Sequence, residues 1–148
     1  MKSYVLVTAL FPVHAAETVS GAAQSATSQV TIRVDGFRND KGELGVNVFR
    51  SPVGWPEESA KAVFHANFPI TGDHATAQFN LPPGRYAIAV LHDENSNHKL
   101  DKNFLGIPTK GFGFANNPKV LFSAPSFDTA ALQVSSPATE TSIHLIYL

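Results

Sequence analysis

The chain has no cysteine among its 148 residues, which excludes disulfide bonds, thiolate metal sites and cysteine nucleophiles. Its net charge is only −1, so the sequence offers no electrostatic attraction for nucleic acid or for an anionic membrane. No apolar run reaches the roughly 20 residues that a membrane-spanning helix needs. With 43% hydrophobic residues the chain can nevertheless bury a core, and its length suits one domain.

The N-terminal sequence has the pattern of a secretory signal peptide. Lys2 gives a positively charged start, residues 4–13 form an apolar run, and the small residues Ala15 and Ala16 follow it. A buried N-terminal strand is the alternative interpretation of this run. Residues 17–28 are small and polar, which is typical of a flexible lead-in. We therefore expect a signal peptide at 1–16, a lead-in at 17–28 and a folded domain at 29–148, in a periplasmic or secreted protein.

Apolar residues alternate with a period of two along much of the remaining chain, which predicts short β-strands. The expected strands are residues 30–34, 44–49, 62–70, 75–81, 85–91, 120–122, 130–134 and 143–148. The first two are expected to pair as a hairpin across the turn at 35–42, and residues 57–61 to form one helical turn. Residues 85–91 are apolar on both faces, which indicates a central strand. Seven or eight short strands without a long helix predict an all-β fold, an antiparallel immunoglobulin-like β-sandwich.

Side-chain oxygens are concentrated in residues 93–101, directly after the expected central strand. Positions 1, 3, 5 and 9 of this 93–101 loop are Asp93, Asn95, Asn97 and Asp101. This is the spacing of the first part of a calcium loop, in which the backbone carbonyl at position 7, here Lys99, adds a ligand. Position 12 is Phe104 instead of a bidentate glutamate, so the loop is not an EF-hand. We expect a structural Ca²⁺ site that binds weakly, with a Kd on the order of 10⁻⁴–10⁻³ M.

Other interpretations of this loop remain open. Asp and Asn side chains also cap backbone N–H groups in Asx turns, which need no metal. His92 and His98 could supply nitrogen ligands to a transition metal, although the other histidines are scattered along the chain. A small metal-dependent hydrolase could use Asp93, Asp101 and His92, but catalytic carboxylates usually lie in a cleft with opposed environments.

Glycine and phenylalanine alternate in residues 111–114, within a loop that lacks the Lys-Ser/Thr pair of a phosphate-binding loop. One interpretation is that the glycines permit turns while the phenylalanines close one end of the sandwich, namely Phe104, Phe112, Phe114 and Phe127. The alternative is an aromatic groove for a glycan, peptide or lipid. Its binding residues would be His92, Trp55, Phe112 and Phe114, although Trp55 also suits a role as core cover.

Two motifs resemble known families. LPPGRYAIAV at residues 81–90 is similar to a strand of transthyretin-like and carboxypeptidase-regulatory-like sandwich domains. GRYAIAVLHDENSNHKLDKNFLGIPTKGFGFANNP at residues 84–118, followed by PSF at 125–127, resembles the bacterial exported family called domain of unknown function 2141. The chain differs from the family's pattern at Ser96 and His98, where small residues or glycine are common, and at Lys110, where an acid is common. The resemblance implies an exported β-sandwich and no particular activity.

The sequence contains no recognisable catalytic set, since its serines lack a G-x-S-x-G elbow. We therefore expect a non-enzymatic accessory or binding domain whose ligand is an unknown protein or glycan of the cell envelope. The metal-dependent hydrolase and the carbohydrate- or peptide-binding module are the alternatives. No nucleic-acid partner and no transmembrane segment are expected.

Overall fold

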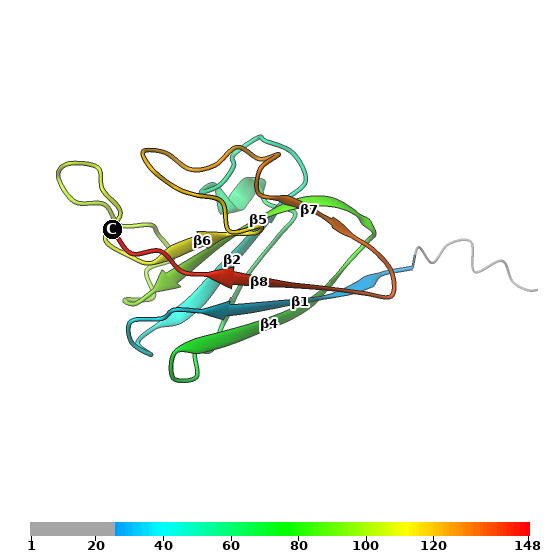
Figure 1. The fold of residues 1–148 in the computed structure, drawn as a ribbon, viewed down its shortest axis with the longest axis horizontal. Coiled ribbons are helices and arrows are strands. Elements are labelled where there is room, and N and C mark those ends of the chain that lie inside the picture. The colour runs from blue at the N-terminus through cyan, green and yellow to red at the C-terminus, as the bar shows by residue number, and fades with distance from the viewer. Residues whose placement is uncertain (1–25) are drawn as a thin grey trace, which may run out of the picture.

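The computed structural model describes residues 26–148, which fold into two β-sheets packed face to face (Figure 1). One sheet has the order β4-β1-β8 and consists of β1 (Ser28–Asp35), β4 (His74–Leu81) and β8 (Ala138–His144). The other has the order β3-β2-β5-β6, with β7 also paired to β5. Its strands are β2 (Glu43–Phe49), β3 (Phe64–Phe68), β5 (Gly84–Asp93), β6 (Phe112–Phe114) and β7 (Ala131–Val134). The predicted signal peptide and most of the predicted lead-in lie outside the described residues.

The main core lies between the sheets and follows the alternation in the sequence. Val30, Ile32 and Val34 on β1 are buried against the apolar residues of β2 and β5. β4 alternates buried and exposed residues along its whole length, because its second face is open to solvent. Each fully buried aliphatic side chain contributes roughly 1.5–3 kcal/mol, so the apolar residues decide which face of each strand turns inward. The predicted all-β sandwich is confirmed.

β5 is the central strand of its sheet, as its two apolar faces predict. It pairs with β2 on one side and with β6 and β7 on the other. Its inner face carries Tyr86, Ile88 and Val90, whereas Ala87 and Ala89 on the outer face are also buried. The hydroxyl of Tyr86 donates a hydrogen bond to the carbonyl oxygen of Pro82 at 2.7 Å. This bond closes the proline-glycine turn that leads into β5.

The structure differs from the prediction in one strand pairing and in the positions of two strands. The predicted hairpin is wrong, because β1 and β2 belong to different sheets and β1 instead pairs with β4 and, in parallel, with β8. Residues 120–122 form no strand, and the three-residue β6 takes the edge position beside β5. The predicted strand at 143–148 overlaps β8 only at Ile143 and His144, because β8 runs from Ala138 to His144. Its first residues lie at a sheet edge and are mostly polar, so they show no apolar alternation in the sequence. Alternation indicates faces but carries no information about which strand is the neighbour.

A second apolar cluster covers the outer face of the five-stranded sheet. Phe112, Phe114 and Phe127 are buried there, so these rings do not close the end of the sandwich as expected. Trp55 packs on them, and its indole N–H donates to the carbonyl oxygen of Pro125 at 2.8 Å. The loops at 50–63 and 115–130 therefore pack on the outer face of the five-stranded sheet and bury its apolar residues.

The glycine of β6 is required for packing and not for a turn. A Cβ atom at Gly113 would lie 2.6 Å from the Cγ2 atom of Ile143, which is closer than real side chains approach.

The predicted helical turn at 57–61 contains a short 3₁₀ helix at Ser59–Lys61. Among residues 26–148, no helix has the length and apolar character needed to cross a membrane.

Candidate functional site

The 93–101 loop is organised by a buried carboxylate at the end of β5. Asp93 is buried, and its Oδ2 atom accepts a hydrogen bond from the backbone N–H of His98 at 2.8 Å. This bond closes a turn in which Ser96 and His98 have positive φ angles of 52° and 61°. Positive φ is uncommon for such residues, so the side chains around the loop must hold this conformation.

The ammonium group of Lys110 lies at the centre of the loop. Its Nζ atom is 2.7 Å from Asp93 Oδ1, 2.5 Å from Asn97 Oδ1 and 2.7 Å from the carbonyl oxygen of Lys99. It also lies 3.1 Å from Asp101 Oδ2. Lys110 is only 4% exposed, so this cation is enclosed by the oxygens of the loop.

The carboxylates of the loop are stabilised in their charged form. Burial raises the pKa of Asp93, but hydrogen bonds from Lys110 and from the backbone of His98, with the charge of Lys110, bring it below the ordinary value. Hydrogen bonds from Asn97, Lys110 and Asn95 likewise lower the pKa of Asp101. Both carboxylates are therefore ionised at neutral pH and face the ammonium group.

Four of the five predicted metal-ligating residues direct oxygens at one point, and that point is the Lys110 nitrogen. Asn95 is arranged differently, because its amide nitrogen donates to Asp101 Oδ2 at 3.1 Å. The Asn95 side-chain oxygen accepts from the backbone N–H of Asn97, which forms an Asx turn. Calcium binding by this loop stays a prediction.

His92 is buried and both of its ring nitrogens have partners. Nε2 lies 2.8 Å from the carbonyl oxygen of Lys41, which can only accept, so Nε2 carries the proton. Nδ1 then accepts from the hydroxyl of Tyr147 at 2.7 Å. Burial raises the pKa of Tyr147, so this phenol keeps its proton at neutral pH. A hydrolase based on Asp93, Asp101 and His92 needs side chains that a substrate can reach. Asp93 and His92 are buried and hydrogen-bonded to other groups, so the geometry does not favour this function.

A second carboxylate–imidazole group shares Asp93. The Nδ1 atom of His98 lies 3.5 Å from Glu43 Oε1 and 3.7 Å from Asp93 Oδ2. The same nitrogen lies 3.2 Å from the amide nitrogen of Asn67. These contacts connect the 93–101 loop to the outer faces of β2 and β3.

Beside the loop, the outer face of the five-stranded sheet forms the floor of a groove of about 1210 Å³. Two rows of side chains cross this floor from strand to strand. One row consists of Asn67, Gly45, Leu91 and Phe112, and the next consists of His65, Asn47, Ala89 and Phe114. Gly45 and Ala89 lie within these rows, and their small side chains leave the floor deep. Asn67 and His65 place an amide and an imidazole group at the β3 side of the floor.

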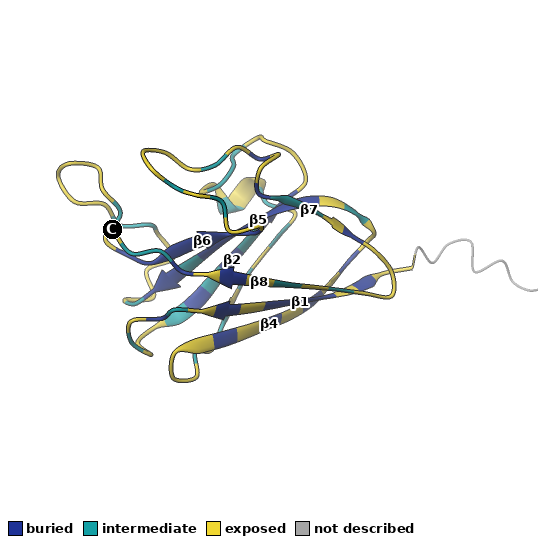
Figure 2. Cartoon of the chain, viewed as in Figure 1, coloured by how far each residue is buried: buried dark blue, intermediate teal, exposed yellow. Residues whose placement is uncertain are grey.

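Exposed apolar side chains are concentrated around this groove. Eight large apolar side chains are exposed among the described residues, and five of them line it: Leu105, Ile107, Leu121, Phe122 and Leu148. Phe122 is 100% exposed. Figure 2 shows the exposed loops after β5 and β6 above the buried strands of the sheet. Exposed apolar surface gathered at a concavity indicates a binding site more strongly than scattered residues do.

One rim of the groove is an ordered arm at residues 101–109. The backbone N–H of Thr109 donates to the carbonyl oxygen of Asp101, and that of Asn103 donates to Ile107, both at 2.9 Å. The side-chain oxygen of Asn103 accepts from the backbone N–H groups of Leu105 and Ile107. These bonds hold the arm in a hairpin-like shape that presents apolar side chains to solvent.

The predicted binding residues divide between groove and core. Phe112 and Phe114 line the groove from its floor, but Trp55 and His92 do not. Sequence reasoning noted Lys110 only as a departure from the family pattern and did not place it in the loop, and it missed the floor residues Gly45, Asn47 and Ala89. The available indications were that departure, and small or polar residues at the outward positions of predicted strands.

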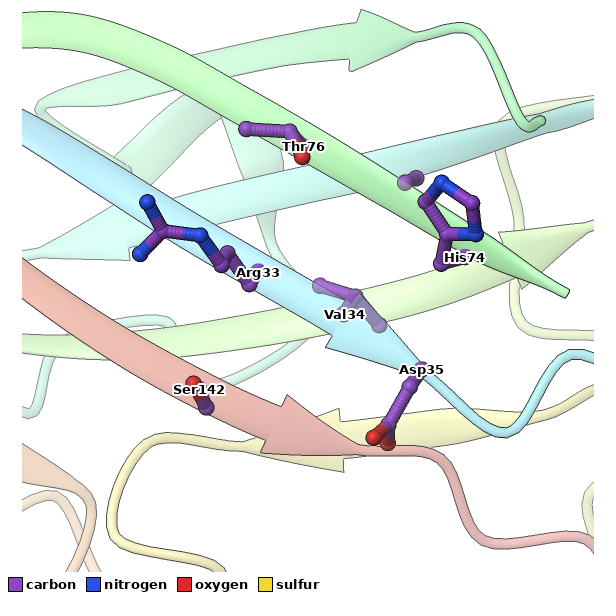
Figure 3. Close-up of a pocket in the computed structure, with 7 residues that line it drawn as sticks. Arg33, Val34, Asp35, His74, Thr76 and Ser142 are labelled. Carbon is purple, nitrogen blue, oxygen red and sulfur yellow. The ribbon is translucent and has the colours of Figure 1, made fainter.

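The outer face of the three-stranded sheet offers a smaller depression. Its volume is about 290 Å³, and Figure 3 shows Arg33 extending along β1 away from the ring of His74. Arg33 pairs with Glu140, and Asp35 pairs with His144. Because these exposed polar groups are paired with one another, the larger groove is the stronger candidate site.

Two packed β-sheets, an ordered Asp/Asn loop and a surface groove bordered by exposed apolar side chains define a β-sandwich domain. A family model described as an uncharacterized protein conserved in bacteria (DUF2141) matches residues 32–142, and the chain belongs to this family. No curated protein and no solved structure matches the chain. The family description names no activity, so the function has to be argued from the geometry.

Proposed function

We propose that the protein is an exported, non-enzymatic binding domain whose groove receives an extended, uncharged and largely apolar peptide segment of a partner protein. The observation that carries this proposal is the gathering of five exposed apolar side chains around one groove. Export rests on the N-terminal signal pattern in the sequence.

The groove can bind both the apolar side chains and the polar main-chain amides of a peptide. Leu105 and Phe122 on the rims can cover apolar side chains, which gives the hydrophobic part of the binding energy. The amide of Asn67 and the ring of His65 stand beside the low floor and can exchange hydrogen bonds with main-chain amides. The arm is already ordered by its own hydrogen bonds, which reduces the entropy lost on binding.

The charges around the groove favour an uncharged occupant. The carboxylate of Glu57 is 3.3 Å from the ammonium of Lys102, and Asp93 is paired with Lys110. A charged ligand would have to displace these partners or pair with the exposed Lys99 on the same wall. A glycan site would be expected to present several exposed aromatic rings, whereas four of the five exposed apolar side chains around this groove are aliphatic and only Phe122 is aromatic.

A groove-filling substitution tests the proposal. Gly45→Leu should place a side chain on the floor without a clash, since a Cβ atom there lies 3.4 Å from its nearest neighbour, Asn67 Oδ1. We expect decapeptides selected from a phage-displayed library to be apolar, and Gly45→Leu to weaken their binding at least about tenfold in fluorescence anisotropy, or about 1.4 kcal/mol. Phe122→Ala should weaken it about threefold to tenfold without lowering the Tm.

Thr76→Leu is the matched control, because Thr76 lies on the exposed face of the other sheet. It should leave peptide binding unchanged. Failure to enrich any peptide, or equal binding by Gly45→Leu and the unmodified protein, would contradict the proposal. Binding on a glycan array that Gly45→Leu abolishes, without any peptide binding, would identify a carbohydrate site instead and overturn the peptide proposal.

A further inference from the structure

The contacts of Lys110 are those of a bound cation and not those of an ordinary surface lysine. Four oxygens from Asp93, Asn97, Lys99 and Asp101 lie between 2.5 and 3.1 Å from its nitrogen. They occupy positions 1, 5, 7 and 9 of the loop, and alternate residues of such a loop direct oxygens to one centre. Asp93 and Lys110 are both buried, so this pair is protected from solvent screening.

We infer that Lys110 supplies the loop's own cation, and that its ammonium group takes the place of a divalent ion in closing the 93–101 loop. Two of the four distances, 2.7 Å to Asp93 and 2.7 Å to the carbonyl oxygen of Lys99, are typical of charge-assisted hydrogen bonds. The nitrogen has four oxygens around it, whereas Ca²⁺ needs six to eight. A Ca²⁺ ion entering this position would have to expel a covalently attached, buried ammonium. The loop is therefore closed whatever the concentration of calcium around the protein.

This inference does not depend on the proposed peptide ligand. It concerns a neighbouring loop, although His98 and Lys99 of that loop also line the groove. An internal cation would keep this wall of the groove in one shape without a metal, and a chelator could not remove it.

The test compares thermal melting in 1 mM EDTA and in 10 mM CaCl₂, with ionic strength matched by NaCl. The unmodified protein should have the same Tm within about 1 °C in both. Lys110→Gln should lose about 10–20 °C in EDTA, because it leaves the buried Asp93 without its charge partner. Calcium should then restore about 5 °C, as expected for a site with a Kd near 10⁻³ M.

Lys102→Gln is the matched control, since Lys102 lies on the arm that precedes Lys110 and forms an exposed pair with Glu57. Its Tm should change by less than about 2 °C and should not respond to calcium. Magnesium at the same concentration is the ion control, because Mg²⁺ keeps its waters and demands strict octahedral geometry. It should restore less stability to Lys110→Gln than calcium does.

Three results would overturn the inference. One is a calcium-dependent rise of more than about 3 °C in the unmodified protein. Another is a Lys110→Gln variant as stable as the unmodified protein in EDTA. The third is a destabilised variant that gains nothing from calcium, which would make Lys110 an ordinary buried ion pair. If the variant is unfolded in EDTA, recovery of its near-ultraviolet circular dichroism in calcium supports the inference, and no recovery contradicts it.

Discussion

Replacement of Asp93 with alanine is expected to destabilise the domain by about 3–5 kcal/mol, the usual cost of removing one partner from a buried ion pair. The substitution leaves the Lys110 ammonium buried beside only one remaining carboxylate, that of Asp101. It also removes the acceptor for the backbone N–H of His98, which has a positive φ. The Tm should fall by about 10–20 °C in a thermal melt followed by circular dichroism.

Asp128→Ala is the control for this prediction, because Asp128 forms an exposed ion pair with Arg85. Exposed pairs contribute little, so its Tm should stay within about 3 °C of the unmodified protein. The double variant Asp93→Asn with Lys110→Met should recover part of the stability lost by Asp93→Ala, since no unpaired charge remains buried. A Tm for Asp93→Ala equal to that of Asp128→Ala would show that the loop is not held by its buried carboxylate.

The faces of the strands could be read from the sequence because burial imposes a period of two. Val30, Ile32 and Val34 on β1 lie inward as their spacing predicts, and the same holds for the alternating residues of β4. The partners could not be read in this way. β1 and β2 have compatible patterns and a turn between them, yet the turn crosses from one sheet to the other. A turn sequence fixes local direction, whereas sheet membership depends on contacts far along the chain.

For the same reason the sequence indicates the 93–101 loop but not its cation, Lys110. The oxygen spacing from Asp93 to Asp101 is local and was visible in the sequence. Lys110 enters the loop only because the arm at 101–109 turns back on itself and brings the chain to the start of β6. The groove is harder to predict from the sequence, because Gly45 and Ala89 lie on the same floor only after β2 and β5 have paired. Its apolar rims lie in loops, where hydrophobic periodicity gives no information.

The loop at 93–101 and the turn at 36–42 form one connected unit at this end of the sandwich. Arg38 and Asn39 on the turn donate hydrogen bonds to the carboxylate of Glu94. The carbonyl oxygen of Lys41 accepts a hydrogen bond from the Nε2–H group of His92. Burial raises the pKa of Glu94, but the hydrogen bonds of Asn39 and Arg38 bring it below its ordinary value. The position of Asp93 therefore depends on how closely the two segments approach.

Gly42→Ala is expected to break this approach. Gly42 has a φ of 70°, and a Cβ atom there would lie 1.9 Å from the backbone oxygen of Asp93. Gly72→Ala is the matched control, because Gly72 has a φ of 62° but no atom within 4 Å of the added Cβ. The control should lose about 1–2 kcal/mol, the cost of a left-handed conformation for alanine. Gly42→Ala carries the same cost and must also push two backbones apart, which adds about 1–3 kcal/mol or more.

The two glycine variants therefore separate backbone strain from steric exclusion. Urea unfolding should place the free energy of unfolding of Gly42→Ala at least about 1–3 kcal/mol below that of Gly72→Ala. The extra loss should be accompanied by weaker amide-exchange protection of His98, because its backbone N–H donates to the Asp93 carboxylate. Equal stability of the two variants would mean that the turn can move away from Asp93 at little cost. The 93–101 loop would then hold its shape through Lys110 and its own hydrogen bonds, without support from the turn.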